Sequence, residues 1–396
     1  MLRHLFTLMW NRKRANGLLV LEIVLAFVVL FAVGSVGAYL LGNYQAPLGF
    51  EYDHVWHIQC DPGAQPEREQ FATWQQILRQ VRATPGVLSV ARSSGNTPYS
   101  TNMNTTSVVL NKGKDQRELP PQVDYSTVGP ELRELMHLTL TEGRWFDRRD
   151  EASTRRPAVI TEALRQALFR PGEPVIGRVL DEPENAQIVG VISAYRQSGE
   201  LQEPRPGILL YVGPQDTASA RNTLLVRVQP GAGAQLEKKI SDEIRAINPT
   251  WSSTIAPLAE ERRTQLKQGL AIPVLEGVVC VFLLVNVALG LFGVLWLNIN
   301  QRRAELGVRR ALGATAAAIS WQVLGEILVL TTFGLVLGLL VAAQFPLLGV
   351  FNVKVEVYLT AMVLAAAGLY MLATVCALYP SQLAAGIQPA VALREE

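Results

Sequence analysis

The chain has 396 residues, of which 49% are hydrophobic and only 18% are charged, and its formal net charge at pH 7 is +2. Its mean hydropathy of +0.19 is high for a soluble globular protein, so the composition argues against an ordinary soluble enzyme or binding protein. The near balance of charge also excludes the strongly basic footprint of a nucleic-acid-binding protein.

Hydrophobic residues are concentrated in four long stretches. The first covers residues 18–42 and holds one charged residue, Glu22; the others cover 270–299, 320–345 and 357–379. About 20 helical residues cross a hydrocarbon core of roughly 30 Å, and each stretch reaches that length. We therefore predict four transmembrane helices.

A cleavable signal peptide is the alternative interpretation of the first stretch. Its apolar run is too long for that, and Tyr39, Leu40 and Leu41 are unsuited to a cleavage site built from small residues. An uncleaved anchor is therefore favoured.

Basic residues beside the spans predict the orientation, because Lys and Arg are enriched in cytoplasmic loops. Four lie before the first span and four between the second and third, whereas the 346–356 loop holds only Lys354. The eight residues are Arg3, Arg12, Lys13, Arg14, Arg302, Arg303, Arg309 and Arg310. Residues 1–17, 300–319 and 380–396 are therefore expected in the cytoplasm, and residues 43–269 and the 346–356 loop on the opposite side.

The exported block alternates strand and helix patterns. Near its start, 54–60 and 86–92 are predicted strands on either side of an amphipathic helix at 66–82. The same order returns near its end, with strands at 223–229 and 251–255 and a helix at 232–247. Two such βαβ units predict one lobe, built from residues 43–110 and 216–256.

Between the two units, further short strands predict a second lobe, inserted at residues 111–215. They lie at 157–160, 178–180, 187–192 and 207–211. Residues 257–269 form a polar stalk that leads to the second span. The predicted fold class is thus an α-helical membrane protein with four transmembrane helices and a large exported α+β domain of two lobes.

The sequence of the exported block provides no disulfide and no excess of charge. It is nearly neutral, with 26 Lys and Arg against 27 Asp and Glu, and Cys60 is its only cysteine. An internal disulfide is therefore excluded. A block of this length can fold on a hydrophobic core alone.

The basic segment, residues 300–319, is predicted to contain a docking helix. On a helical wheel one face carries small or apolar side chains and another carries charge. The first face is Ala304, Val308, Ala311 and Thr315; the second is Arg302, Glu305 and Arg309. Gly307 and Gly313 each weaken a helix by about 1 kcal/mol relative to Ala, which favours a turn or a close backbone approach. A positive loop lying against lipid headgroups is the alternative.

The segment resembles the cytoplasmic segment of the MacB/FtsX family of ABC-transporter permeases, which follows the pattern E-(I/L)-G-(I/V)-x-(R/K)-A-(L/I)-G-A. The matching residues are Glu305, Leu306, Gly307, Val308, Arg310, Ala311, Leu312, Gly313 and Ala314. Glu326 resembles the family's acidic residue in the third span, and residues 378–380 and 387–394 resemble its LYPA and terminal PxxALR motifs, with Ser381 replacing the alanine. Residues 143–146 resemble a G-R-x-F turn of its periplasmic core domain.

The resemblance implies a bacterial inner-membrane permease with a porter-like exported lobe and an inserted second lobe. It also implies a partner, a cytoplasmic ABC ATPase dimer, whose groove receives the basic segment. The implied docking residues are Arg302, Arg303, Glu305, Leu306, Gly307, Arg309, Arg310, Ala311, Leu312 and Gly313. Such permeases relay nucleotide-driven closure to the exported domain, a mechanism known as mechanotransmission.

Nucleotide chemistry is expected in the partner rather than in this chain. The sequence contains no G-x-x-x-x-G-K-[ST] motif, so no phosphate-binding loop is encoded. ATP and Mg are therefore expected in the ATPase, and neither a catalytic residue, a cofactor nor a metal is assigned here. His54 and His57 lack the further ligands that a metal site needs.

Small residues in the spans are candidates for helix pairing. Gly334 and Gly338 have the small-xxx-small spacing, and Gly34, Gly37 and Glu326 are further packing candidates. They favour a second permease copy or a paralogous permease as a partner within the membrane lipid.

Three functions remain open from the sequence. The first is export, with a periplasmic adaptor and an outer-membrane channel; the second is an FtsX-like relay that activates a cell-wall enzyme; the third is lipoprotein release. The two-lobed exported block is larger than a small activating domain requires, which favours export. The cargo cannot be read from the chain.

Overall fold

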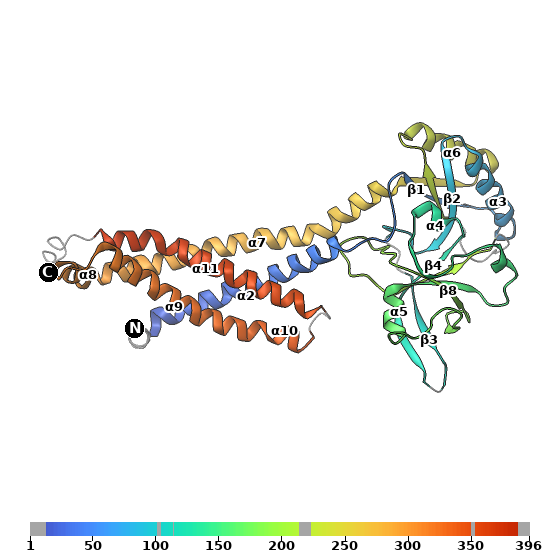
Figure 1. Cartoon of the computed structure of the whole chain (residues 1–396). Helices are drawn as coiled ribbons and strands as arrows, with labels where there is room; N and C mark the ends of the chain where they lie inside the picture. Colours follow the sequence, from blue (N-terminus) through green and yellow to red (C-terminus); the bar gives the residue numbers. More distant parts are fainter. Residues whose placement is uncertain (1–12, 101–103, 114, 214–222, 350–352, 387–396) are drawn as a thin grey trace. The chain divides into compact units, whose positions relative to one another are not determined.

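A computed structural model describes the chain except residues 1–12, 101–103, 114, 214–222, 350–352 and 387–396 (Figure 1). The chain divides into two compact units, which we call the head domain and the helical unit. The head domain is residues 43–269, and the helical unit is residues 1–42 with 270–396.

In the described part of the chain, four helices are long and apolar enough to cross a membrane. They are α2 (Lys13–Gln45), α7 (Leu258–Gln301), α9 (Ala316–Ala342) and α11 (Val355–Ala385). Two shorter helices, α8 (Arg303–Ala311) and α10 (Gln344–Leu347), flank α9. The chain is therefore a multi-pass membrane protein with four spans, as the hydropathy pattern predicted.

Some helices extend beyond the predicted spans. The predictions ended each span where the residues become polar, but a helix can continue past that point. The predicted stalk and second span form one continuous 44-residue helix, α7. Nothing in the polar residues 258–269 stops a helix, so α7 runs through the change in polarity. Likewise α9 begins at Ala316, and α11 continues past residue 379 through Pro380 and ends at Ala385.

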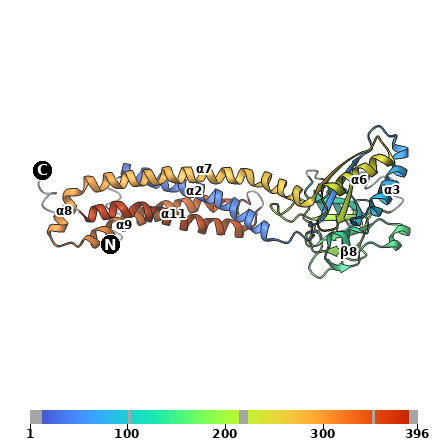
Figure 2. The same cartoon turned by 90° about the horizontal axis from the view of Figure 1, so that it is seen from above.

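Inside the helical unit, α9 and α11 lie side by side (Figures 1 and 2). An aromatic cluster joins α2, α10 and α11, because the Phe31 ring lies 5.4 Å from that of Phe345 and 6.2 Å from that of Tyr358. Phe27 and Ile23 of α2 are fully buried. The first span is therefore packed into the unit rather than peripheral to it.

The head domain contains eleven described strands and four α-helices. The strands are β1 (Val55–Asp61), β2 (Val87–Gly95), β3 (Thr105–Leu110), β4 (Arg117–Val128), β5 (Leu140–Gly143), β6 (Pro157–Thr161), β7 (Leu180–Glu182), β8 (Gln187–Ile192), β9 (Gly207–Tyr211), β10 (Thr223–Val228) and β11 (Ser252–Pro257). The helices are α3 (Glu67–Ala83), α4 (Leu132–Met136), α5 (Glu162–Leu168) and α6 (Ala234–Ile247), and a 3₁₀ turn, η1, covers Arg148–Ala152.

The first lobe is formed by two interleaved βαβ units. Its strand order is β11-β1-β10-β2 with antiparallel neighbours, so β10 separates β1 from β2 and β1 separates β10 from β11. This is the split βαβ arrangement of ferredoxin-like folds. Helices α3 and α6 lie together (Figure 2) and bury Trp74, Ile77, Ile240 and Ile244 against the strands.

The second lobe is a mixed sheet in the order β4-β9-β6-β8-β5. The β2 strand pairs with β10 along most of its length and with β4 at Ser93–Gly95, so one continuous sheet passes through both lobes. The predicted lobe boundary at residue 110 places β3 in the wrong lobe. Strands β3 and β4 pair in antiparallel register, so a boundary between them would divide a hairpin. The predicted fold class, four membrane helices with a large α+β domain, is confirmed.

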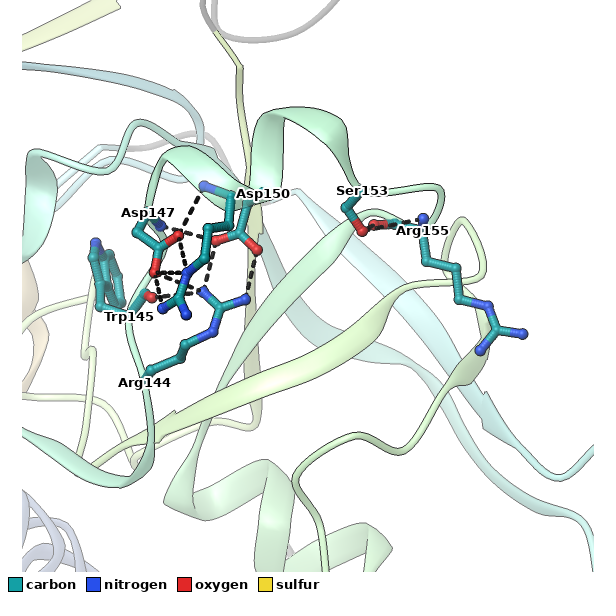
Figure 3. A network of polar contacts seen from close by, with 7 residues as sticks. Arg144, Trp145, Asp147, Asp150, Ser153 and Arg155 are labelled. Carbon is teal, nitrogen blue, oxygen red and sulfur yellow. Dashed lines mark hydrogen bonds and ion pairs between the residues drawn. The ribbon is translucent and has the colours of Figure 1, made fainter.

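The G-R-x-F turn, residues 143–146, is locked by a polar network (Figure 3). The Arg144 guanidinium donates to both carboxylate oxygens of Asp150 at 2.8 and 2.7 Å, and Gly143 has the left-handed φ of 69°. Asp147 caps η1, and hydrogen bonds from Arg149 lower the pKa of Asp147 to about 2. Trp145 is buried and donates to the carbonyl of Pro130 at 2.8 Å, so this motif is a structural corner.

Candidate functional site

The basic segment folds as a short helix between two turns. Helix α7 ends at Gln301, Arg302 leaves the helical conformation with φ −104° and ψ 15°, and α8 then runs from Arg303 to Ala311. The side chain of Thr315 accepts a hydrogen bond from the Ala318 amide at 3.2 Å and so caps α9.

Gly313 ends α8 in the left-handed conformation, with φ 97°. Its amide donates to the Arg310 carbonyl at 3.1 Å, and the Ala314 amide donates to the Arg309 carbonyl at 3.0 Å. These two bonds are the Schellman motif, in which glycine has no Cβ penalty. The turn expected at Gly313 is therefore a helix C-terminus.

One face of α8 is buried against the spans. Leu306 is only 2% exposed and packs in a cluster with Ile299 of α7 and with Ile319 and Val323 of α9. Gly307 beside it is also buried. The backbone of α8 therefore lies close to the ends of the spans, and Leu306 fixes its position.

A polar network attaches α8 to α9 at the edge of this cluster. Arg302 donates to Glu326 at 2.7 Å and to Glu305 at 3.1 Å, and Arg309 donates to Glu305 and to Gln322, each at 2.7 Å. Gln322 in turn donates to Glu326 at 3.1 Å. Each carboxylate thus accepts from an arginine and is compensated within the chain.

Arg302 stays charged in this site. Burial opposes its charge, but hydrogen bonds with Glu305 and Glu326 outweigh that effect and raise its pKa above the ordinary arginine value. The pair of Arg302 and Glu326 joins the start of α8 to α9.

The opposite face of α8 is apolar and exposed. It presents Ala304, Val308 and Ala311, and Leu312 follows directly. Leu312 is 83% exposed and Val308 is 42% exposed. We call Ala304, Val308, Ala311 and Leu312 the apolar ridge.

The docking residues stay a prediction, and the structure shows where each of them lies. Arg302 and Arg309, proposed as partner contacts, bind carboxylates of their own chain, and Leu306 and Gly307 face the spans. Arg303, Ala311, Leu312 and Gly313 are exposed, whereas Arg310 is half-buried. A helical wheel shows which residues share one face of a helix. It does not show which of these faces packs against the spans.

The glycines predicted to pair with a second copy pack mostly within the chain. A Cβ on Gly334 would lie 2.5 Å from Ile23 Cγ2, and one on Gly338 would lie 2.5 Å from Phe27 Cδ1, both in α2. Gly34 faces Ala361 of α11, and nothing lies within 4 Å of a Cβ on Gly37. The small-xxx-small pair therefore serves the α2–α9 contact, and it no longer supports a second copy.

Gln322 was missed as a functional residue. Of the apolar ridge, Ala311 and Leu312 were among the predicted docking residues, whereas Ala304 and Val308 were placed on the apolar face but not in that set. Gln322 and Glu326 have the i,i+4 spacing of helix neighbours, which was a signal in the sequence. The contact of Arg302 with Glu326 joins two helices, so no spacing rule indicates it. Leu312 is exposed at the C-terminus of α8, whereas Ala314, just after the turn at Gly313, packs against the cluster again.

Two family models match the chain. Residues 17–243 match the MacB-like periplasmic core domain, and residues 277–389 match the FtsX-like permease C-terminal domain. The chain belongs to the MacB/FtsX permease family. The basic segment lies within the second match, and most of the head domain lies within the first.

Curated relatives of this permease are ABC transporter components. It is 26% identical over 285 residues to the macrolide export ATP-binding/permease protein MacB 1/2 of Paracoccus denitrificans, covering 68% of this chain and 41% of the relative. It is 27% identical over 285 residues to the pyoverdine export ATP-binding/permease protein PvdT of Pseudomonas putida, covering 66% of this chain and 41% of the relative.

A third relative is described as a permease alone. The permease is 26% identical over 278 residues to the ABC transporter permease YvrN of Bacillus subtilis, covering 66% of this chain and 68% of that protein. The chain therefore spans about two fifths of the length of the ATP-binding/permease relatives and about two thirds of YvrN.

Proposed function

We propose that this permease docks a separate cytoplasmic ABC ATPase dimer and transmits its nucleotide-driven closure to the head domain, for export of a substrate. The apolar ridge is the observation that carries the proposal. Val308 of α8 and Leu312 directly after it are exposed, while Leu306 on the other face of α8 packs against α7 and α9. A helix that lays an apolar face into a groove is a common way to bind a partner.

The attachment of α8 supports transmission of force. Leu306 packs between α7 and α9, and the network of Arg302, Arg309 and Glu326 joins α8 to α9. A displacement of the apolar ridge therefore has to move the ends of both spans. A loosely tethered loop would absorb the same displacement.

Mechanical transmission is favoured over a polar conduit through the spans. A conduit for polar cargo needs polar side chains along its walls. Glu326, one of the few acidic residues in the spans, accepts hydrogen bonds from Arg302 and Gln322 beside α8. It belongs to the docking region rather than to a pathway.

The partners follow from the same proposal. ATP and Mg bind in the ATPase dimer, and a second permease copy or a paralogous permease completes the membrane part in the inner membrane. Both ends of the chain and the basic segment face the cytoplasm, and the head domain faces the periplasm. Relatives are named for macrolides and for pyoverdine, so the cargo class is left to experiment.

The test replaces the apolar ridge. We expect Val308→Glu with Leu312→Glu to insert normally but to lower stimulation of the ATPase by about tenfold or more, because two groove contacts become charged. Leu88→Glu is the matched control, an exposed leucine of the head domain. Stimulation is measured with purified permease in nanodiscs. Unchanged stimulation in the ridge variant would exclude docking through α8.

Proteins that co-purify with the wild-type permease then distinguish the three candidate functions. An adaptor and an outer-membrane channel are the result expected for export. A cell-wall hydrolase in their place would indicate the relay, and bound lipoprotein would indicate lipoprotein release.

A further inference from the structure

The chain enters and leaves the head domain at two segments that contact one loop. The entry is residues 43–46 at the end of α2, and the exit is residues 258–269 at the start of α7. The loop is residues 195–202, between β8 and β9, and we call it the 195–202 loop.

Arg196 attaches the loop to the entry segment. Its side chain is buried, with the residue 5% exposed. Its Nη1 donates to the carbonyls of Asn43 at 3.0 Å and Ala46 at 2.7 Å, and its Nη2 donates to those of Glu200 at 3.0 Å and Gln202 at 2.6 Å. The last carbonyls of a helix lack partners within it, so the guanidinium completes the end of α2. The same side chain holds both ends of the loop together.

Glu200 attaches the loop to the exit segment. It is 5% exposed and forms an ion pair with Arg262 of α7, whose guanidinium also lies 4.8 Å from the centre of the Tyr52 ring. Gln265 donates to the Ser198 carbonyl at 3.1 Å. A buried carboxylate that loses its partner is strongly destabilised, so Arg262 cannot leave Glu200 without cost.

Leu201 lies between the two segments. Its carbonyl accepts a hydrogen bond from the Asn43 side chain at 3.2 Å, and its Cδ1 would lie 2.7 Å from a Cβ on Gly269. The absence of a side chain at Gly269 therefore allows the close approach. Entry, exit and loop are in contact through this one residue.

The loop is rooted in the second lobe. Its flanking strands, β8 and β9, both pair with β6, and β9 also pairs with β4. Movement of the loop therefore acts on the centre of that sheet. The Gln197 carbonyl also accepts from the Tyr99 amide at 2.8 Å, which links the loop to the segment after β2.

We propose that the 195–202 loop makes the entry and exit segments move as one body and passes their movement to the second lobe, with Arg196 and the Glu200–Arg262 pair as positioning residues. This inference rests on the proposed mechanical function. The inference goes beyond that function in two ways. It assigns the transmission of movement inside the head domain to named residues, and it identifies the second lobe as the part that responds.

The test uses the full permease with its ATPase in nanodiscs and follows amide hydrogen exchange with and without vanadate-trapped nucleotide. In the wild type we expect nucleotide to change exchange in three segments: 43–50, 258–269 and 187–211. In Arg196→Met we expect stimulation of the ATPase to persist, basal exchange of residues 43–50 to rise by about tenfold, and the nucleotide effect at 187–211 to disappear.

Arg117→Met is the matched control. Arg117 also joins a carbonyl, that of Leu168, to a carboxylate, that of Glu173, but it lies elsewhere in the second lobe. We expect it to keep the nucleotide effect at 187–211. Loss of that effect in both variants would mean that any lost arginine softens the lobe, and it would overturn the inference.

A charge exchange keeps the test decisive if Arg196→Met does not fold. We expect Glu200→Arg and Arg262→Glu each to lose the nucleotide effect at 187–211, and the double variant to recover it. A nucleotide effect that survives in both single variants would overturn the assignment. A wild type that docks but shows no nucleotide effect in any segment would instead refute the proposed function.

Discussion

At the residue scale, charge around α8 has a different role from the one that its position in the sequence indicated. Four arginines between two spans look like contacts for a partner, yet Arg302 and Arg309 satisfy Glu305 and Glu326 of the same chain. Leaving Glu326 without a partner in its half-buried position would cost free energy. The network therefore fixes α8, and the apolar ridge is the surface that we propose for recognition.

The turn after α8 gives a prediction for a single residue. Gly313→Ala should destabilise the turn by about 1–2 kcal/mol, because a Cβ is disfavoured at positive φ. The cost is confined to the backbone, since nothing lies within 4 Å of a Cβ placed there. We expect trypsin to cleave faster after Arg309 and Arg310, as measured by the rate of fragment appearance from the membrane-embedded permease.

Gly325→Ala is the control for this substitution. A Cβ on Gly325 also meets nothing within 4 Å, but the residue lies inside α9 with ordinary helical geometry. Alanine favours the helix by about 1 kcal/mol there, so cleavage should not accelerate. Equal cleavage rates in the two variants would show that the left-handed turn is not important for α8.

At the element scale, the periodicity of the sequence predicted the helices and strands better than it predicted their order in the sheet and their contacts. The apolar runs gave four spans, and the strand and helix patterns placed β1, α3, β2, β10, α6 and β11 within a few residues. The interleaving of the two βαβ units was not predicted, because strand order depends on contacts between residues more than 100 positions apart. The contact of Arg302 with Glu326 was missed for another reason: it joins two elements, so no spacing within one helix indicates it.

The glycines of the spans give a prediction about one helix contact. Gly338→Ala should destabilise the helical unit by about 1–3 kcal/mol, because its Cβ would overlap the buried ring of Phe27. Gly37→Ala, with open space around its Cβ, should be neutral or stabilising by up to about 1 kcal/mol. Thermal unfolding in detergent micelles measures both. A Gly338→Ala protein as stable as Gly37→Ala would contradict the α2–α9 contact.

At the scale of the whole molecule, the basic residues beside the spans indicate which side of the membrane each unit faces. The positive-inside rule counts Lys and Arg rather than net charge, so the pairing of Arg302 and Arg309 with carboxylates does not weaken it. Four spans return the chain to the side on which it started. The basic segment should then face the cytoplasm, and the head domain should be outside.

Cysteine labelling tests this orientation in cells. A membrane-impermeant maleimide should label Lys112→Cys, an exposed head-domain position, in spheroplasts and should label Leu312→Cys only in inverted vesicles. Native Cys60 should not react with the maleimide, because burial raises the pKa of its thiol to about 12. At pH 8 it forms roughly a thousandfold less thiolate than a thiol of ordinary pKa. Peptide mapping separates it from Cys280 and Cys376. Labelling of Leu312→Cys from outside would reverse the orientation, and a cytoplasmic ATPase could then not reach the apolar ridge.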